Sequence, residues 1–250
     1  MAEVGTGPAV EKSCFGADGC RGGWILAAAD AELGVAEFRL CQTFAEVLAI
    51  VGVGAHLAVD IPIGLSESGP RACDVAARAF LPRARKSSVF PTPCRVALAG
   101  KTYAEQCALN RKASGKAISK ELHYILPKIR EVDRALMPEW QEWVHEAHPE
   151  VVFAVLTGDG VALPSKKTAE GLSVRLDLLR RYLAVDPDWL RQERRRLARP
   201  TEGITVTLDD LVDALACLIA ARQVARGEAR HFPPDRQEYD SRGLRMEIVG

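Results

Sequence analysis

Residues 13–43 read SCFGADGCRGGWILAAADAELGVAEFRLCQT, and this stretch predicts three short strands. The segments 13–20, 23–30 and 34–43 are largely apolar and are separated by glycines and by the polar break at residues 30–32. Short apolar segments divided by turn residues are typical of neighbouring antiparallel strands. We therefore expect a meander of three strands in this part of the chain.

The segments that follow alternate between helix and strand. A helix is expected after Thr43, and a buried strand over residues 57–61 is apolar except for Asp60. Ser119 should cap another helix, HPEVVFAVLTG (148–158) is predicted to be a strand, and residues 171–183, 188–199 and 207–227 have helical patterns. The tail near residues 243–249 predicts one short strand. The main order, β-β-β-α-β-α-β-α, is similar to that of the ribonuclease H-like fold, with a central mixed five-stranded sheet and helices on both faces.

Composition excludes several classes of protein. The chain has 250 residues, of which 48% are hydrophobic, with 33 Lys and Arg against 33 Asp and Glu. A disordered chain is excluded because this composition can fill a core. No apolar run is long enough to span a membrane, and residues 1–13 lack the plan of a signal peptide, so we expect a cytoplasmic protein without a membrane partner. Seven cysteines without a CxxC pair are typical of reduced, buried thiols.

Charge is distributed unevenly along the chain. Residues 66–130 hold thirteen Lys or Arg against four Asp or Glu, a local charge of +9. We expect one domain over residues 1–250 that carries this basic stretch as an insertion. Such an asymmetry indicates an anionic partner, although a solvated face balanced by acidic neighbours would also explain it.

Three aspartates interrupt apolar elements. Asp18 lies within the first predicted strand, Asp60 ends the strand over residues 57–61, and Asp213 lies in the most apolar helix. Each could have a local role in a turn, a backbone hydrogen bond or an exposed helix edge. In a ribonuclease H-like topology, however, these elements converge on one edge of the sheet, and carboxylates that meet there repel one another unless a cation neutralises them.

Mg²⁺ or Mn²⁺ would suit such a cluster because both are hard ions that take oxygen ligands. Two ions about 3.5–4 Å apart can activate water and stabilise the leaving oxygen of a phosphodiester. The sequence therefore predicts a metal-dependent nuclease with Asp18, Asp60 and Asp213 as metal ligands and catalytic residues. Asp210 shares a helical face with Asp213 and could be a further ligand or form a capping box with Thr207.

Several motifs carry a resemblance to a known family. They are GADGCRGGW, VDIPIGL, RACDVAARAFL, SSVFPTPCR, ISKELHYILPKIREVD, EAHPEVVFAVLTG, SKKTAEG and DDLVDALA. From about Phe15 to Ala221 the chain resembles the domain of unknown function 429 (DUF429) family, which is grouped with ribonuclease H-fold proteins as predicted nucleases. The resemblance implies this fold and a predicted nuclease activity.

The last helix also resembles the closing acidic helix of Holliday-junction resolvases. This likeness implies paired metal ligands at Asp210 and Asp213, with Asp18 matching the first-strand carboxylate. Asp60 stands where those enzymes place a Glu, and its shorter side chain would bring the metal closer to the strand. Because junction-cutting relatives are dimers, a homodimer is also compatible with the sequence.

Glu150 is a further candidate for metal binding or general-base catalysis. If EAHPEVVF is a strand, Glu146, His148 and Glu150 share one face. His145 and His148 have HxxH spacing, which is a weak zinc signal without a third ligand nearby. A hydrogen-bonded His–Glu pair at the start of a strand is the alternative interpretation.

Nucleic acid is the expected partner, and basic and hydroxyl side chains in two segments are its candidate contacts. The expected contacts are Arg85, Lys86, Ser88, Arg95, Lys166 and Lys167. Phe90 could stack on a base or anchor its loop in the core. Lys166 and Lys167 precede a predicted helix start, where an anion could bind.

Other functions fit the sequence less well. Asp18-Gly19 faintly resembles the first phosphate loop of sugar kinases and actin-like ATPases, but those proteins need two such domains, and no GxxxxGK[ST] motif occurs. A GxSxG turn for a serine hydrolase is also missing. The main alternative is a non-catalytic nucleic-acid or nucleotide binding module of the same fold.

Overall fold

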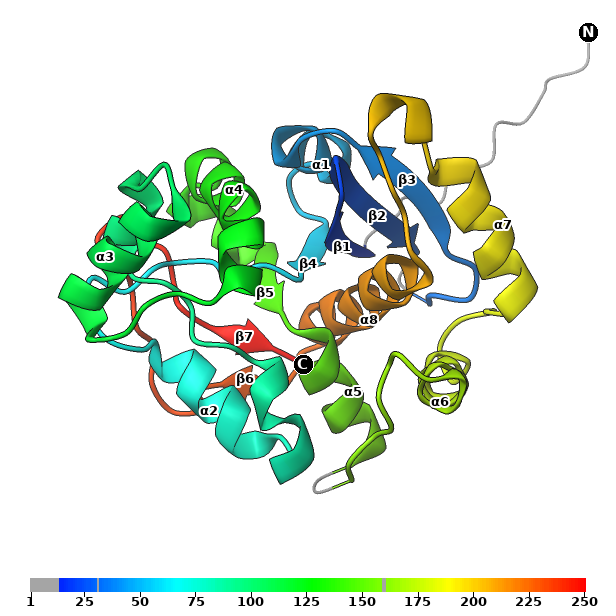
Figure 1. Ribbon diagram of the computed structural model, residues 1–250. Helices are drawn as coiled ribbons and strands as arrows, with labels where there is room; N and C mark the ends of the chain where they lie inside the picture. Colours follow the sequence, from blue (N-terminus) through cyan, green and yellow to red (C-terminus); the bar gives the residue numbers. More distant parts are fainter. Residues whose placement is uncertain (1–13, 31, 159–160) are drawn as a thin grey trace, which may run out of the picture.

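The computed structural model describes residues 14–30, 32–158 and 161–250, which form a mixed α/β structure around one seven-stranded sheet (Figure 1). The strand order is β3-β2-β1-β4-β5-β7-β6. The strands are β1 (Cys14–Cys20), β2 (Gly23–Ala29), β3 (Glu37–Cys41), β4 (His56–Val59), β5 (Val144–Ala147), β6 (His231–Phe232) and β7 (Ile248–Val249). The antiparallel order β3-β2-β1 confirms the predicted meander.

The sheet is larger than the sequence predicts. Two strands of two residues each, β6 and β7, extend it from five strands to seven. β7 pairs in parallel with β5, and β6 pairs antiparallel with β7. The predicted strand in the tail is confirmed at β7, whereas β6 is too short to leave a periodic pattern.

Parallel pairing in the centre of the sheet places Asp18 beside Asp60. β1 pairs in parallel with β4, and β4 pairs in parallel with β5. The backbone N–H of Asp60 donates to the carbonyl of Ala17 at 2.9 Å, which continues the pairing one residue past β4. The carboxyl ends of the three strands therefore share one edge, as expected for parallel strands.

Helix α8 (Leu208–Ala225) lies directly on β1, and Gly16 makes this approach possible (Figure 1). A Cβ at Gly16 would lie 2.1 Å from the backbone nitrogen of Leu218 and 2.2 Å from the carbonyl oxygen of Ala214. Every residue from 211 to 221 is buried. Because the helix and strand backbones touch, the Asp213 side chain is held at the same edge as Asp18.

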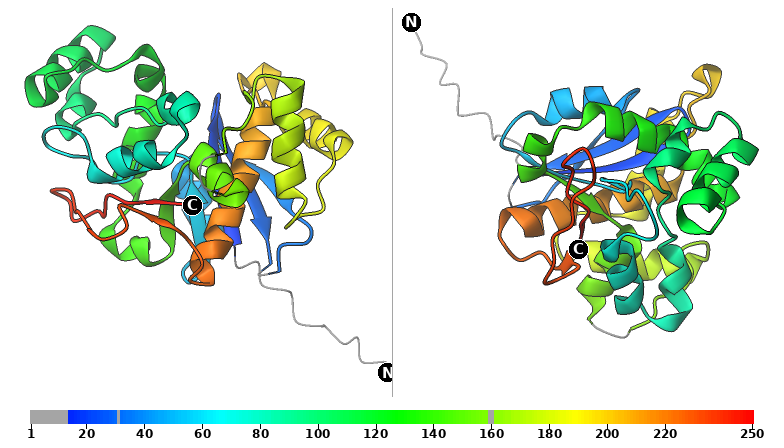
Figure 2. Two further views of the ribbon diagram at one scale, coloured as in Figure 1. Left: turned by 90° about the horizontal axis from the view of Figure 1, so that it is seen from below. Right: turned by 90° about the vertical axis from the view of Figure 1, so that its left-hand side faces the viewer.

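Helices cover both faces of the sheet. One face packs against α8, α5 (Pro149–Thr157), α6 (Ala169–Leu179) and α7 (Pro187–Leu197), and the other packs against α1 (Phe44–Val51) and α4 (Lys120–Ala135). The remaining helical segments are α2 (Ala72–Phe80), α3 (Tyr103–Ser114) and the 3-10 turns η1 (Arg83–Ser88), η2 (Arg95–Ala99), η3 (Pro138–Glu142) and η4 (Pro200–Glu202). Helices α2 and α3 lie on the opposite side of the molecule from α6 and α7 (Figures 1 and 2).

The expected insertion over residues 66–130 contains α2, η1, η2, α3 and most of α4. Ser119 caps α4 as predicted, because its hydroxyl accepts from the backbone N–H of Leu122. Leu122, Leu126 and Ile129 of α4 are buried in the core on the face of the sheet that α1 and α4 cover. The basic stretch therefore contributes its last helix to the core. The division into one domain with an insertion stays a prediction.

The predicted strand over residues 148–158 is wrong. Strand β5 ends at Ala147, and Pro149 begins helix α5 with His148 as its N-cap residue. Proline favours the first turn of a helix because its φ is fixed and it lacks an N–H. The run of Val and Phe that indicated a strand is instead a helix whose residues 149–154 are all buried.

None of the helices that the structure describes is long and apolar enough to cross a membrane. The expected absence of a signal peptide concerns residues 1–13, which lie outside the described residues.

Candidate functional site

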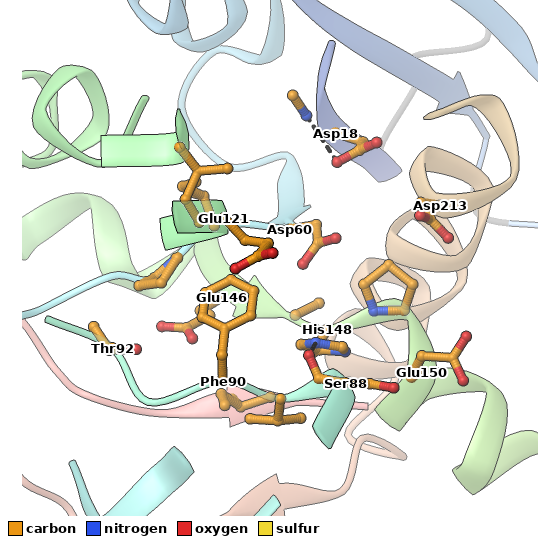
Figure 3. A pocket seen from close by; sticks show the side chains of 18 of the residues that line it. Asp18, Asp60, Ser88, Phe90, Thr92, Glu121, Glu146, His148, Glu150 and Asp213 are labelled. Carbon is orange, nitrogen blue, oxygen red and sulfur yellow. Dashed lines mark hydrogen bonds between the residues drawn. The ribbon is translucent and has the colours of Figure 1, made fainter. Parts of the chain in front are cut away.

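A cavity of about 530 Å³ opens at the carboxyl edge of β1, β4 and β5. Asp18, Asp60 and Asp213 all line it, although they are up to 195 positions apart in the sequence. Figure 3 shows their carboxylates facing a common space between β1, the end of β4 and α8. The predicted convergence of these three acids on one pocket is therefore present in the fold.

Asp18 is 8% exposed and forms no salt bridge with the other residues that the structure describes, although the charge of Lys166 lowers its pKa. Its Oδ1 accepts a hydrogen bond from the backbone N–H of Gly19 at 2.8 Å (Figure 3). Burial raises the pKa of Asp18 well above its usual value, and the charges of Asp60 and Asp213 raise it further. The fold thus holds this carboxyl where a negative charge is costly.

Asp60 and Asp213 share this environment with Lys166. Burial raises the pKa of Asp60, and this effect outweighs the lowering effect of His148 and Lys166. Burial also raises the pKa of Asp213 to about 6, although Lys166 Nζ lies 2.7 Å from its Oδ2. Burial lowers the pKa of Lys166, but Asp213, Asp60 and Asp209 together raise it by more, so the ammonium stays charged. Among the described residues, Lys166 is therefore the cation that forms a salt bridge with one of the three carboxyls.

The donor chemistry of this pocket suits a hard divalent cation. Three carboxyls supply oxygen donors, and a bound cation would offset both the burial and the mutual repulsion that raise the pKa values of Asp18 and Asp213. In the described part of the chain, however, no three His, Cys, Asp or Glu side chains are already arranged to hold a metal ion. Binding would thus require the carboxyls to draw together and Lys166 to release Asp213.

Glu150 lines the cavity but is engaged elsewhere. Its Oε1 accepts from Arg175, which is 1% exposed and also donates to the carbonyls of Pro164 and Gly171. Glu146, His148 and Glu150 do not share a strand face as predicted, because they lie at the end of β5, at a helix cap and in the first turn of α5. All three nevertheless line the cavity.

The two histidines of the HxxH motif lie in different surroundings. His148 Nε2 lies 3.1 Å from the carbonyl oxygen of Ser88, so this ring nitrogen donates to the η1 segment. His145 points elsewhere, because it lines a separate pocket beside His231 and Glu247. The two residues of the HxxH motif therefore belong to different sites.

Asp210 forms the capping box that the sequence allows. Its Oδ2 accepts from the backbone N–H of Thr207 at 2.7 Å, and the Thr207 hydroxyl accepts from the backbone N–H of Asp210. Asp210 does not line the cavity, but its charge contributes to the raised pKa of Asp18. It lies close enough to act on the acidic cluster electrostatically.

The predicted nucleic-acid contacts divide into two groups. Arg85, Ser88, Lys166 and Lys167 line the cavity. Lys86 is exposed and lies outside the cavity lining. Arg95 is bound by Asp133 at 3.0 Å, by Asp240 and by Glu67, so it joins the basic stretch to the tail rather than facing the cavity.

Two cationic side chains that line the cavity are not among the predicted contacts. Lys128 of α4 donates to the carbonyl of Gly23 and lies 4.3 Å from the Trp24 ring centroid. Arg71, 1% exposed, binds both Glu146 oxygens at 2.7 Å and also binds Asp74. The only signal for Lys128 was a charge beside the apolar stripe of α4, and the signal for Arg71 was its place before a helix.

A family model described as "Protein of unknown function (DUF429)" matches residues 16–238. The chain belongs to the DUF429 family. The match covers most of β1, the basic stretch and α8, so all three aspartates of this DUF429 protein lie within it. Neither a curated protein nor a solved structure matches the chain significantly.

Proposed function

We propose that this DUF429 protein is a nuclease that hydrolyses phosphodiester bonds with two Mg²⁺ or Mn²⁺ ions. Asp18, Asp60 and Asp213 would hold the ions, and Asp210 or Glu150 would complete the ligand shell. The observation that carries this proposal is the meeting of three carboxyls, from three separate elements, in one cavity at the sheet edge.

We further propose a ribonuclease H-like fold for the core of the sheet. The order β3-β2-β1-β4-β5 has three antiparallel strands followed by parallel ones, and the last long helix packs on β1. These features support the proposal because they bring the first strand, the fourth strand and the final helix to one edge. The strands β6 and β7 would be additions to that core.

Hydrolysis adds water across the phosphorus–oxygen bond and releases a phosphomonoester and an alcohol. When bound, the ions would activate the water and stabilise the leaving oxygen. The three aspartates would fix the ions, which requires their ionised form. Lys166 would move from Asp213 to a phosphate oxygen, and Lys167 and Arg85 line the same cavity as further contacts to the phosphate backbone.

One observation favours the alternative of a non-catalytic binding module. Lys166 already neutralises Asp213, so part of the negative charge of the pocket is balanced without a metal ion. A panel of single-stranded, duplex and branched substrates with Mg²⁺ or Mn²⁺ separates the two functions. The nuclease predicts metal-dependent cleavage that is lost in Asp18→Asn. A binding module predicts no cleavage in either protein and retained or tighter nucleic-acid binding by the variant.

A further inference from the structure

We infer that the cavity accepts a single unpaired nucleotide, with its base against Phe90 and Ile125 and its phosphodiester at the three aspartates. This inference rests on the proposed function and specifies its substrate class. It starts from the two chemically different walls of the cavity. Asp18, Asp60 and Asp213 form one wall, and the basic stretch supplies the other, on which Val89, Phe90 and Ile125 are apolar and lie among charged side chains such as Glu121 and Lys128.

Packing against the core fixes the apolar side chains of the cavity lining. Phe90 and Ile125 are each partly exposed, and both pack against the buried core on the α1 and α4 side of the sheet. Both also line the cavity, and Figure 3 shows Phe90 across the pocket from Asp213. A fixed aromatic ring beside a charged pocket suits a nucleobase, because every base has a face that can stack.

The size of the cavity argues against a paired duplex. Its volume of about 530 Å³ lies within the range of sites that enclose one small ligand. Nine separate segments contribute to its lining: residues 18–19, 60–62, 71–74, 85–92, 121–128 of α4, 146–150 and 165–167, together with Asp213 and Ile248. A base that enters a pocket of this kind must first leave its stack, which costs least in single strands and at unpaired positions.

Cations on the cavity lining fit the same orientation. Lys166 and Lys167 lie on the side of Asp213, and Arg85 comes from η1, just before Phe90 in the chain. A nucleotide whose base rests on Phe90 would direct its phosphates toward the aspartates and these cations. The basic stretch, which supplies Arg85, Phe90 and Ile125, would thus select the substrate while β1, β4 and α8 hold the reacting groups.

The inference can be tested with oligonucleotides that contain one 2-aminopurine, whose fluorescence falls when the base stacks. Three probes of the same sequence are compared in Ca²⁺: a single strand, a duplex with the 2-aminopurine unpaired, and a fully paired duplex. We expect quenching and tight binding with the first two only. Phe90→Leu should weaken binding of the single strand about tenfold, in line with the loss of one stacked base.

Two further variants complete the experiment. Phe80→Leu is the matched control, because Phe80 is also a partly buried phenylalanine but lies outside the cavity lining. Ile125→Ala tests the same wall from α4 if Phe90→Leu folds poorly. Equal binding of the paired duplex, or unchanged quenching in both wall variants, would overturn the inference.

The proposed nuclease activity is judged separately, by Mn²⁺-dependent cleavage of the single strand. Cleavage without selective quenching would leave the nuclease proposal standing and refute the nucleotide pocket. Selective quenching without cleavage would do the opposite. Failure of every probe to bind would refute both.

Discussion

Replacing Asp213 with Asn should stabilise the metal-free protein at neutral and alkaline pH. Burial raises the pKa of Asp213 to about 6 from an ordinary value of 3.8, so the folded protein binds a proton more tightly than the unfolded chain. Between these values the folded state carries more protons, and its stability therefore falls as the pH rises. Asparagine has nearly the same shape and stays neutral, so the variant should escape this loss.

The expected magnitude follows from the size of the shift. A rise of about two units in the pKa of Asp213 lowers the free energy of unfolding by ~3 kcal/mol at pH values above 6, since each pKa unit is worth about 1.4 kcal/mol. For a chain of this length, that difference corresponds to about 6–12 °C in Tm. Below pH 4 both proteins carry a neutral side chain at this position, and their free energies of unfolding should agree.

Thermal and urea unfolding in EDTA at pH 4, 6 and 8 measure this effect. Asp177→Asn is the control, because its carboxylate is 64% exposed in a pair with Arg180 and its loss should change stability little. Addition of Mn²⁺ at pH 8 should stabilise the native sequence and leave Asp213→Asn unchanged. Asp18 and Asp60 also have raised pKa values, so part of the pH dependence should remain in the variant. A variant that is less stable than the native sequence at pH 8, or whose stability falls between pH 4 and pH 8 by as much as that of the native sequence, would refute the reasoning.

Three other substitutions probe the support of the site. Lys166→Met should tighten Mn²⁺ binding in calorimetry, because the ammonium no longer competes for Asp213; weaker binding would contradict this competition. Gly16→Ala should lower the free energy of unfolding by about 1–3 kcal/mol and reduce cleavage, because its Cβ would lie 2.1 Å from the α8 backbone; normal stability in urea would show that α8 can move freely. Arg175→Met should lower the free energy of unfolding by about 3–5 kcal/mol, because it leaves Glu150 buried without a cation. Adding Glu150→Gln should recover part of that loss, and equal stability of the single and double variants would contradict the pairing.

The acidic cluster could be predicted because each aspartate breaks a strongly apolar element. Asp18, Asp60 and Asp213 stand out in β1, after β4 and in α8, and a charge in such a place needs a partner or a function. Their order along the chain, combined with the expected topology, was enough to bring them together. The sequence could not show that Lys166 pairs with Asp213, because no local pattern joins a loop residue to a helix 47 positions away.

The errors have equally specific causes. Residues 148–158 are predicted to be a strand because a short, largely buried helix and a buried strand have similar apolar runs. Strand β6 has two residues, which is below the length at which alternation can be read. Glu150 accepts a hydrogen bond from Arg175, which lies 25 positions away in the sequence. Only the packing of α5 against α6 brings the two side chains together.

Mn²⁺-dependent cleavage of a labelled single strand tests the central claim most directly. The native sequence should cleave with a rate that rises and saturates as Mn²⁺ is added. Asp18→Asn, Asp60→Asn and Asp213→Asn should each lose this activity, while Asp177→Asn keeps it. Cleavage that persists in the three pocket variants, or a native protein that folds, binds no Mn²⁺ and cuts nothing, would contradict the claim that these carboxyls form a metal-dependent nuclease centre.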